Sequence, residues 1–136
     1  MKPRIRIVNP KGLAKPLGSY SHVARAQAGE WLFIAGQVAV DARGRLVGAG
    51  DFETQARQVF KNLGAALKSA GAGYGNIVQF TTYLVDSRDI PKLRKFRERH
   101  YAKWFPGGQY PPNTLLVIDR LVSEDFLLEI SAIAAL

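Results

Sequence analysis

The alternation of apolar and polar residues predicts six strands. Six segments show either period-two alternation or a run of β-branched and aromatic residues, and they cover residues 5–7, 31–40, 46–47, 77–85, 114–118 and 126–134. A polar turn at 41–45 predicts that the second and third of these form a hairpin. Another polar turn, at 123–125, joins the last two strands.

Two further segments carry apolar residues three and four positions apart, which is the spacing of one helical face. The first spans residues 52–70, where Asp51 can cap the start and Gly71 can close the end. The second runs from Ile90 to Trp104 and ends before a Pro-Gly-Gly turn. The predicted order is β-β-β-α-β-α-β-β, in the α+β class.

Two helices can cover only one face of such a sheet. An apolar sheet face of this size is rarely left in water, so we expect other copies of the chain to cover the second face. No repeat or linker interrupts the pattern, and 136 residues support one hydrophobic core. We therefore expect residues 1–136 to form a single domain that self-associates.

Composition narrows the possible classes of function. The chain has no cysteine and only two histidines, His22 and His100, which are far apart in sequence, so we expect no metal site. No apolar run reaches the roughly 20 residues that cross a bilayer, and no signal-peptide pattern is found, so we expect a cytoplasmic protein without a membrane partner. The net charge of +8 favours encounters with anionic metabolites or phosphates.

Glu129 is the most informative single residue, because it lies inside the apolar run 126–133. In a strand it shares a face with Leu127 and Ile133, while Leu128, Ile130 and Ala132 point into the core. A carboxylate in this position is paired, exposed or functional. One interpretation is an interface carboxylate that pairs with a cation such as Arg120, and the other is a catalytic group.

Five short segments, each weak alone, are specific when taken together. They are Gly-Ser-Tyr-Ser at 18–21, Leu-Phe-Ile-Ala-Gly-Gln at 32–37, Gly-Asp-Phe-Glu-Thr-Gln at 50–55, Tyr-Ala-Lys-Trp-Phe at 101–105 and Leu-Glu-Ile-Ser-Ala-Ile-Ala at 128–134. In this order and spacing they resemble the Rid family, the reactive intermediate deaminases formerly called YjgF-type proteins. The resemblance implies a chorismate-mutase-like α+β homotrimer with three small-molecule pockets between its subunits. It also implies hydrolysis of enamines and imines such as 2-aminoacrylate, without a cofactor.

The same resemblance assigns candidate site residues. Glu129 matches the family glutamate that positions or activates the attacking water. Tyr20 matches a pocket tyrosine, and Gly36 matches a pocket glycine whose missing side chain leaves room for a ligand. Thr114 and Leu115 complete the predicted pocket together with Asn113. The alternatives for Tyr20 and Gly36 are a core tyrosine and a turn glycine.

The sequence departs from the family pattern at Asn113, where deaminating members carry an arginine. An arginine holds a substrate carboxylate through a charged, two-pronged contact, and an amide cannot replace its charge. Ala35 replaces a serine of the family pocket, and Glu98 is matched to an asparagine of the second helix. The pattern is similar to Rid subgroups that lack the arginine. It predicts a ligand other than 2-aminoacrylate, or a trimer that binds a metabolite without turning it over.

Nothing in the sequence places another cation in the pocket in place of the missing arginine. Arg25, Arg88 and Arg120 are candidates by residue type alone, and solvated surface is the expected place for each. His22 could be an acid or base, but a lone loop histidine is more often a surface residue or a satisfied partner, so it is left out of the catalytic set.

The competing functional class is RNA binding or endoribonuclease activity through the second predicted helix. Its basic residues are Lys92, Lys95, Arg99 and Lys103 at helical spacing, with Arg88, Arg94 and Arg97 nearby. The same residues also form the ordinary solvent face of an amphipathic helix, which Glu98 interrupts and which has no interleaved aromatic residues. The sequence therefore argues against a nucleic-acid partner.

Overall fold

A computed structural model describes residues 2–136. Its elements are β1 (Arg4–Val8), β2 (Val23–Gln27), β3 (Trp31–Gln37), α1 (Phe52–Ser69), β4 (Ile77–Leu84), α2 (Ile90–Trp104), β5 (Asn113–Val117) and β6 (Leu128–Ala135), with short 3₁₀ turns at Tyr74–Asn76, Ser87–Asp89 and Pro106–Gly108. The predicted α+β class and the order β-β-β-α-β-α-β-β are confirmed.

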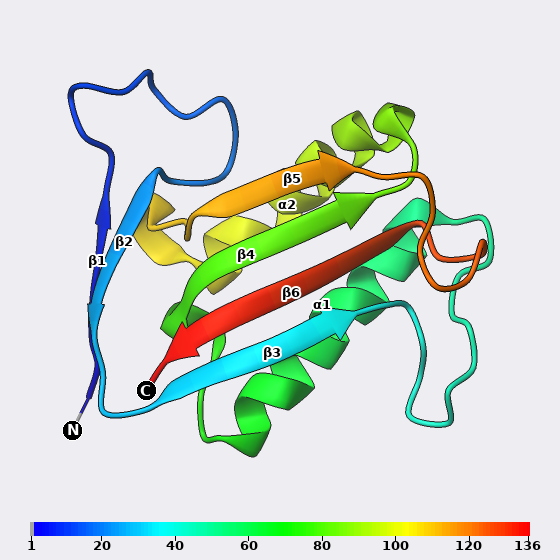
Figure 1. Cartoon of the computed structure of the whole chain (residues 1–136), viewed down its shortest axis with the longest axis horizontal. Helices are drawn as coiled ribbons and strands as arrows, with labels where there is room; N and C mark the ends of the chain where they lie inside the picture. Colours follow the sequence, from blue (N-terminus) through cyan, green and yellow to red (C-terminus); the bar gives the residue numbers. More distant parts are fainter. Residues whose placement is uncertain (1) are drawn as a thin grey trace.

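Four strands form the main sheet in the order β3-β6-β4-β5, while β1 and β2 form a separate antiparallel ribbon (Figure 1). The pair β4 and β5 is parallel because α2 crosses over between them, and the other pairs of the main sheet are antiparallel. An isolated bridge between Ser21 and Pro112 holds the end of the 9–22 loop beside the start of β5. The turn at 123–125 thus joins two strands, β5 and β6, that are separated in the sheet by β4.

The predicted hairpin at 31–47 is wrong in its second arm. Beyond β3 the chain turns back with one isolated antiparallel bridge, between Val40 and Leu46, so residues 46–47 form no strand. The additional strand before α1 is β2, which precedes β3. The sequence of β2, Val-Ala-Arg-Ala-Gln, has one β-branched residue and therefore a weak local signal for a strand. Its pairing with all five residues of β1 makes it a strand.

Both helices pack on one face of the main sheet, as predicted (Figure 1). The helix α1 begins at the predicted cap, where the Asp51 carboxylate accepts a hydrogen bond of 3.2 Å from the Thr54 amide. Its end is closed by Gly71, whose φ of 71° lies in the left-handed region. An aromatic cluster joins the helices, with Phe60 stacked on Trp104 and Phe96 at centroid distances of 4.9 and 5.4 Å.

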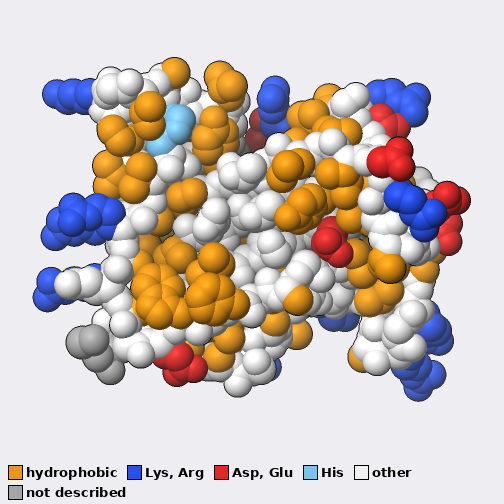
Figure 2. Space-filling model, in the orientation of Figure 1, with side chains coloured by type: hydrophobic (Ala, Val, Ile, Leu, Met, Phe, Trp, Pro, Cys, Tyr) orange, Lys and Arg blue, Asp and Glu red, His pale blue; other side chains and the backbone are white. Residues whose placement is uncertain are grey.

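The second face of the sheet is uncovered in the single chain. Figure 2 shows apolar side chains gathered on this face over the beginning of β3, where Phe33 is 74% exposed and Trp31 is also exposed. Among residues 2–136, no helix is long and apolar enough to cross a membrane.

Candidate functional site

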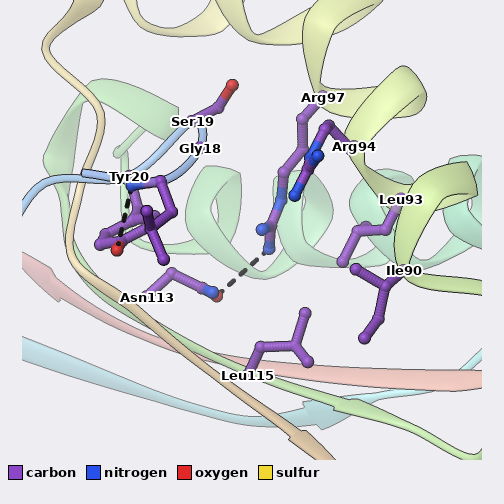
Figure 3. Close-up of a pocket in the computed structure, with 10 residues that line it drawn as sticks. Gly18, Ser19, Tyr20, Ile90, Leu93, Arg94, Arg97, Asn113 and Leu115 are labelled. Carbon is purple, nitrogen blue, oxygen red and sulfur yellow. Dashed lines mark hydrogen bonds between the residues drawn. The ribbon is translucent and has the colours of Figure 1, made fainter. Parts of the chain in front are cut away.

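A cavity of about 250 Å³ lies on the helix side of the sheet, between α2, the start of β5 and the loop that precedes β2. Figure 3 shows that side chains from these three segments converge on it. Its lining consists of Leu17, Gly18, Ser19, Tyr20, Ile90, Leu93, Arg94, Arg97, Asn113 and Leu115.

The loop wall of this cavity is held in place by backbone contacts. The bridge between Ser21 and Pro112 places the Gly-Ser-Tyr segment against β5. The Tyr20 hydroxyl accepts a hydrogen bond of 3.3 Å from the Leu17 amide, which holds the tyrosine side chain against its own loop. Segments almost 100 residues apart in sequence therefore build one small site.

Arg97 is the most unusual residue of the cavity, because it is a charged side chain with only 6% of its surface exposed. Its Nη2 donates to Thr82 Oγ1 at 3.1 Å and to Asn113 Oδ1 at 3.2 Å. The Thr82 hydroxyl also donates to Asn113 Oδ1, at 2.7 Å. These contacts fix the guanidinium at the position of Asn113, as the dashed line in Figure 3 marks.

The charge of Arg97 has no carboxylate partner within ion-pair distance among residues 2–136. Its Nε is buried and makes no hydrogen bond within the same part of the chain. The guanidinium carbon lies 5.5 Å from the centroid of the Tyr101 ring, at a distance where cation–π attraction acts. Burial raises the pKa of Tyr101, so this phenol stays neutral beside the cation.

A second group of predicted residues lies on the uncovered face of the sheet. The strand β6 alternates as expected: Leu128, Ile130 and Ala132 are buried in the core, and Glu129 faces the other side. The Glu129 carboxyl group lies directly over Gly36 of β3. A methyl group at position 36 would come within 2.6 Å of Glu129 Cδ, so the close approach requires glycine.

The single chain therefore does not bring all six predicted site residues together. Tyr20, Asn113 and Leu115 line the cavity on the helix side. Gly36 and Glu129 lie on the opposite face, and so does Thr114, which is exposed next to the inward-facing Asn113 and Leu115.

Within the described chain, Arg120 does not pair with Glu129. Arg120 Nη1 donates instead to Glu124 Oε1, at 3.2 Å. Within the described chain, the Glu129 carboxylate makes no hydrogen bond or ion pair with another side chain.

Sequence reasoning missed Arg97, which it grouped with the solvent-exposed basic residues of the second helix. A usable signal was present: Arg97 follows Leu93 by four residues and precedes Tyr101 by four, so it lies on the buried face of α2. Its neighbour Glu98, matched to the asparagine of the family, is exposed and does not line the cavity.

The cations considered from sequence are placed elsewhere, as expected. Arg88 pairs with Asp86 at 2.6 Å, and Arg25 lies on the β1–β2 ribbon. His22 lies in the loop with its Nε2 2.6 Å from the Ala14 carbonyl oxygen, which makes it a satisfied loop histidine.

The exposed basic residues of α2 are partly neutralised. Lys92 pairs with Asp89 at 2.9 Å, and Arg99 pairs with Glu53 at 2.7 Å, whereas Lys95 and Lys103 make no ion pair within residues 2–136. In that same range there is no group of three or more His, Asp or Glu residues that could hold a metal ion.

Comparison with known proteins agrees with this architecture. The family model described as Endoribonuclease L-PSP matches residues 12–136. The chain belongs to the Rid family. A RutC family protein from Pyrococcus horikoshii is 35% identical over 128 residues, which cover 94% of this chain and 95% of that protein. The fold is similar to that of a Yersinia pestis Rid-family protein of unknown function, with a TM-score of 0.86 and 32% identity. The match covers 97% of this chain and 98% of the Yersinia pestis chain.

A third relative carries a named activity. The human 2-iminobutanoate/2-iminopropanoate deaminase is 29% identical over 103 residues, which cover 75% of this chain and 73% of that protein. That protein deaminates 2-iminobutanoate and 2-iminopropanoate.

Proposed function

We propose that this Rid-family protein is a homotrimer that hydrolyses an enamine or imine metabolite in pockets between its subunits. The observation that carries the proposal is Glu129: a carboxylate on an otherwise apolar strand, seated over Gly36 and without a partner in the described chain. A carboxylate without a partner on an apolar strand contributes little to the folding free energy, so a role toward a ligand is the better explanation for Glu129. The human relative that deaminates 2-iminobutanoate supports the reaction class.

The chemistry requires one base and one electrophilic carbon. Glu129 accepts a proton from water while the water oxygen bonds to the imine carbon, and the C=N π electrons move to nitrogen, which takes up a proton. The resulting tetrahedral adduct loses ammonia and leaves a carbonyl product. In sum, one imine and one water give one carbonyl compound and one ammonia, and no cofactor enters the balance.

The trimer is proposed because the site residues lie on two faces of one sheet. Association through the uncovered face would bury Phe33 and Trp31, and it would bring the open face of one subunit next to its neighbour. A pocket between subunits can then use Glu129, Gly36 and Thr114 from one face together with residues from the helix side of another subunit.

The test is imine hydrolysis by the purified protein, with imines generated from a panel of amino acids by an amino-acid oxidase. We expect Glu129→Gln to abolish turnover at unchanged oligomeric state. The matched control is Glu98→Gln, the same chemical change on the exposed side of α2, which we expect to leave turnover unchanged. Equal turnover in wild type and Glu129→Gln would remove Glu129 from the mechanism.

The second candidate is a trimer that binds a metabolite without turnover. Asn113 favours it, because the strand arginine of deaminating members is absent from this sequence. Two results together would favour this candidate over hydrolysis. The wild type would turn over no imine of the panel while an arginine-bearing relative is active in the same assay, and it would bind a ligand saturably.

A further inference from the structure

We infer that Arg97 holds the carboxylate of the ligand, and that the cavity between α2 and β5 selects small carboxylates with an apolar tail. This inference deepens the proposed function, because it names the ligand class and the binding residue of that pocket. Its basis is the placement of one buried, unpaired guanidinium beside Asn113.

The first argument is electrostatic. A buried charge is costly unless a counter-charge or a full set of hydrogen bonds compensates it. Arg97 is 6% exposed, its Nε has no partner, and no carboxylate lies within ion-pair distance in the described chain. An anionic ligand in the adjoining cavity supplies the missing counter-charge.

The second argument is geometric. Thr82 and Asn113 both contact Nη2, so one side of the guanidinium is anchored and its orientation is set before a ligand arrives. Arg94, one helical turn earlier, also lines the cavity, and Figure 3 shows its guanidinium beside the Arg97 side chain. These two guanidinium groups are the positively charged part of the lining.

The third argument concerns the rest of the wall. Leu17, Ile90, Leu93 and Leu115 line the same cavity, so the part of the ligand beyond its carboxylate meets apolar surface. A volume of about 250 Å³ is below the range of roughly 300 to 1,000 Å³ typical of drug-sized ligands. The site therefore fits a short aliphatic or small aromatic carboxylate.

The same geometry reinterprets Asn113. The arginine that deaminating members carry on this strand is absent, and a guanidinium from α2 lies beside the position instead, with Arg97 Nη2 3.2 Å from Asn113 Oδ1. The side chain of Asn113 is a positioning group: its oxygen anchors the cation, and its amide nitrogen remains available to a ligand.

The experiment compares a carboxylate with its neutral isostere. Binding of isovalerate and isovaleramide is measured by titration calorimetry at constant salt, on the full-length protein. We expect wild type to prefer isovalerate. Arg97→Gln should weaken isovalerate binding roughly ten-fold to a hundred-fold, the usual effect of losing a charge-assisted contact, and should leave isovaleramide binding unchanged. The matched control, Arg57→Gln on the exposed side of α1, should bind like wild type.

Two further variants keep the inference testable if Arg97→Gln fails to fold. Arg94→Gln changes an exposed side chain and should weaken isovalerate binding without affecting isovaleramide. The exchange variant Arg97→Asn with Asn113→Arg returns the arginine to β5 and should recover the preference for carboxylate. Loss of stability with an unchanged ratio of the two affinities would show that Arg97 is structural only, and a wild type that does not distinguish the two ligands would also overturn the inference.

The outcomes separate this inference from the proposed reaction, because isovalerate cannot be hydrolysed as an imine. Carboxylate preference without imine turnover would leave Arg97 assigned and refute the hydrolysis. Imine turnover without carboxylate preference would support the hydrolysis and refute the role of Arg97.

Discussion

Gly36→Ala probes how tightly Glu129 is positioned, and its effects on activity and on stability should differ sharply. The added methyl group would lie 2.6 Å from Glu129 Cδ, 2.7 Å from Cγ and 2.8 Å from Oε2. Ordinary van der Waals contact begins at 3.4 Å, so the carboxyl group must move by about 0.8 Å. The atoms in its way belong to one flexible side chain.

The cost in folding free energy should be small. Turning a side chain by about 30° out of its rotamer costs roughly 0.5 to 1.5 kcal/mol. At about 4 °C per kcal/mol for a chain of this size, the melting temperature should fall by about 6 °C at most.

The cost in activity should be much larger. A catalytic group misplaced by about 1 Å can lose on the order of a hundred-fold in rate, because the reacting atoms no longer align. Imine turnover and thermal unfolding are measured on the same preparation, with Gly29→Ala as control, since a methyl group there meets no atom within 4 Å. Gly36→Ala with the turnover of wild type would refute the coupling between Gly36 and Glu129.

Three other predictions concern the scaffold. Gln55→Leu should destabilise the fold by roughly 2 to 4 kcal/mol in urea unfolding, because the buried amide serves the Gly48 and Asp125 carbonyls and the Leu127 amide, which would lose their partner. Phe60→Ala should cost about 3 to 5 kcal/mol, because its ring is the centre of the aromatic cluster. Asp51→Asn should keep a side-chain cap at the start of α1, and this cap should no longer weaken in acid. The helical circular dichroism signal is measured for both proteins between pH 7 and pH 2.

The sign of the acid effect follows from the pKa of Asp51. The hydrogen bond from the Thr54 amide lowers this pKa below its ordinary value of 3.8. A lowered pKa in the folded state contributes stability above pH 3.8 that is lost as the pH falls through the folded value. Wild type and Asp51→Asn with identical acid unfolding would contradict the assignment, as would Gln55→Leu or Phe60→Ala with the unfolding midpoint of wild type.

Local patterns were sufficient for most of the secondary structure. The helical spacing of 52–70, the cap at Asp51 and the alternation around Glu129 are properties of neighbouring residues, and the structure confirms each of them. The strand β2 was beyond such reasoning, because its residues become a strand only through pairing with β1. For the same reason the short segment after β3 failed to become an arm of a hairpin.

The sequence by itself singled out the candidate site residues, with Glu129 and Asn113 foremost, because a carboxylate in an apolar strand and an amide in place of an arginine are visible in the chain alone. Only the tertiary structure decided which of them meet. Successive strand residues face opposite sides of a sheet, so Asn113 and Thr114 lie on different faces. For the same reason Glu129 lies on the face opposite the cavity. Arg97 reaches Asn113 because α2 packs against β4 and β5, a contact between distant segments that local spacing cannot specify.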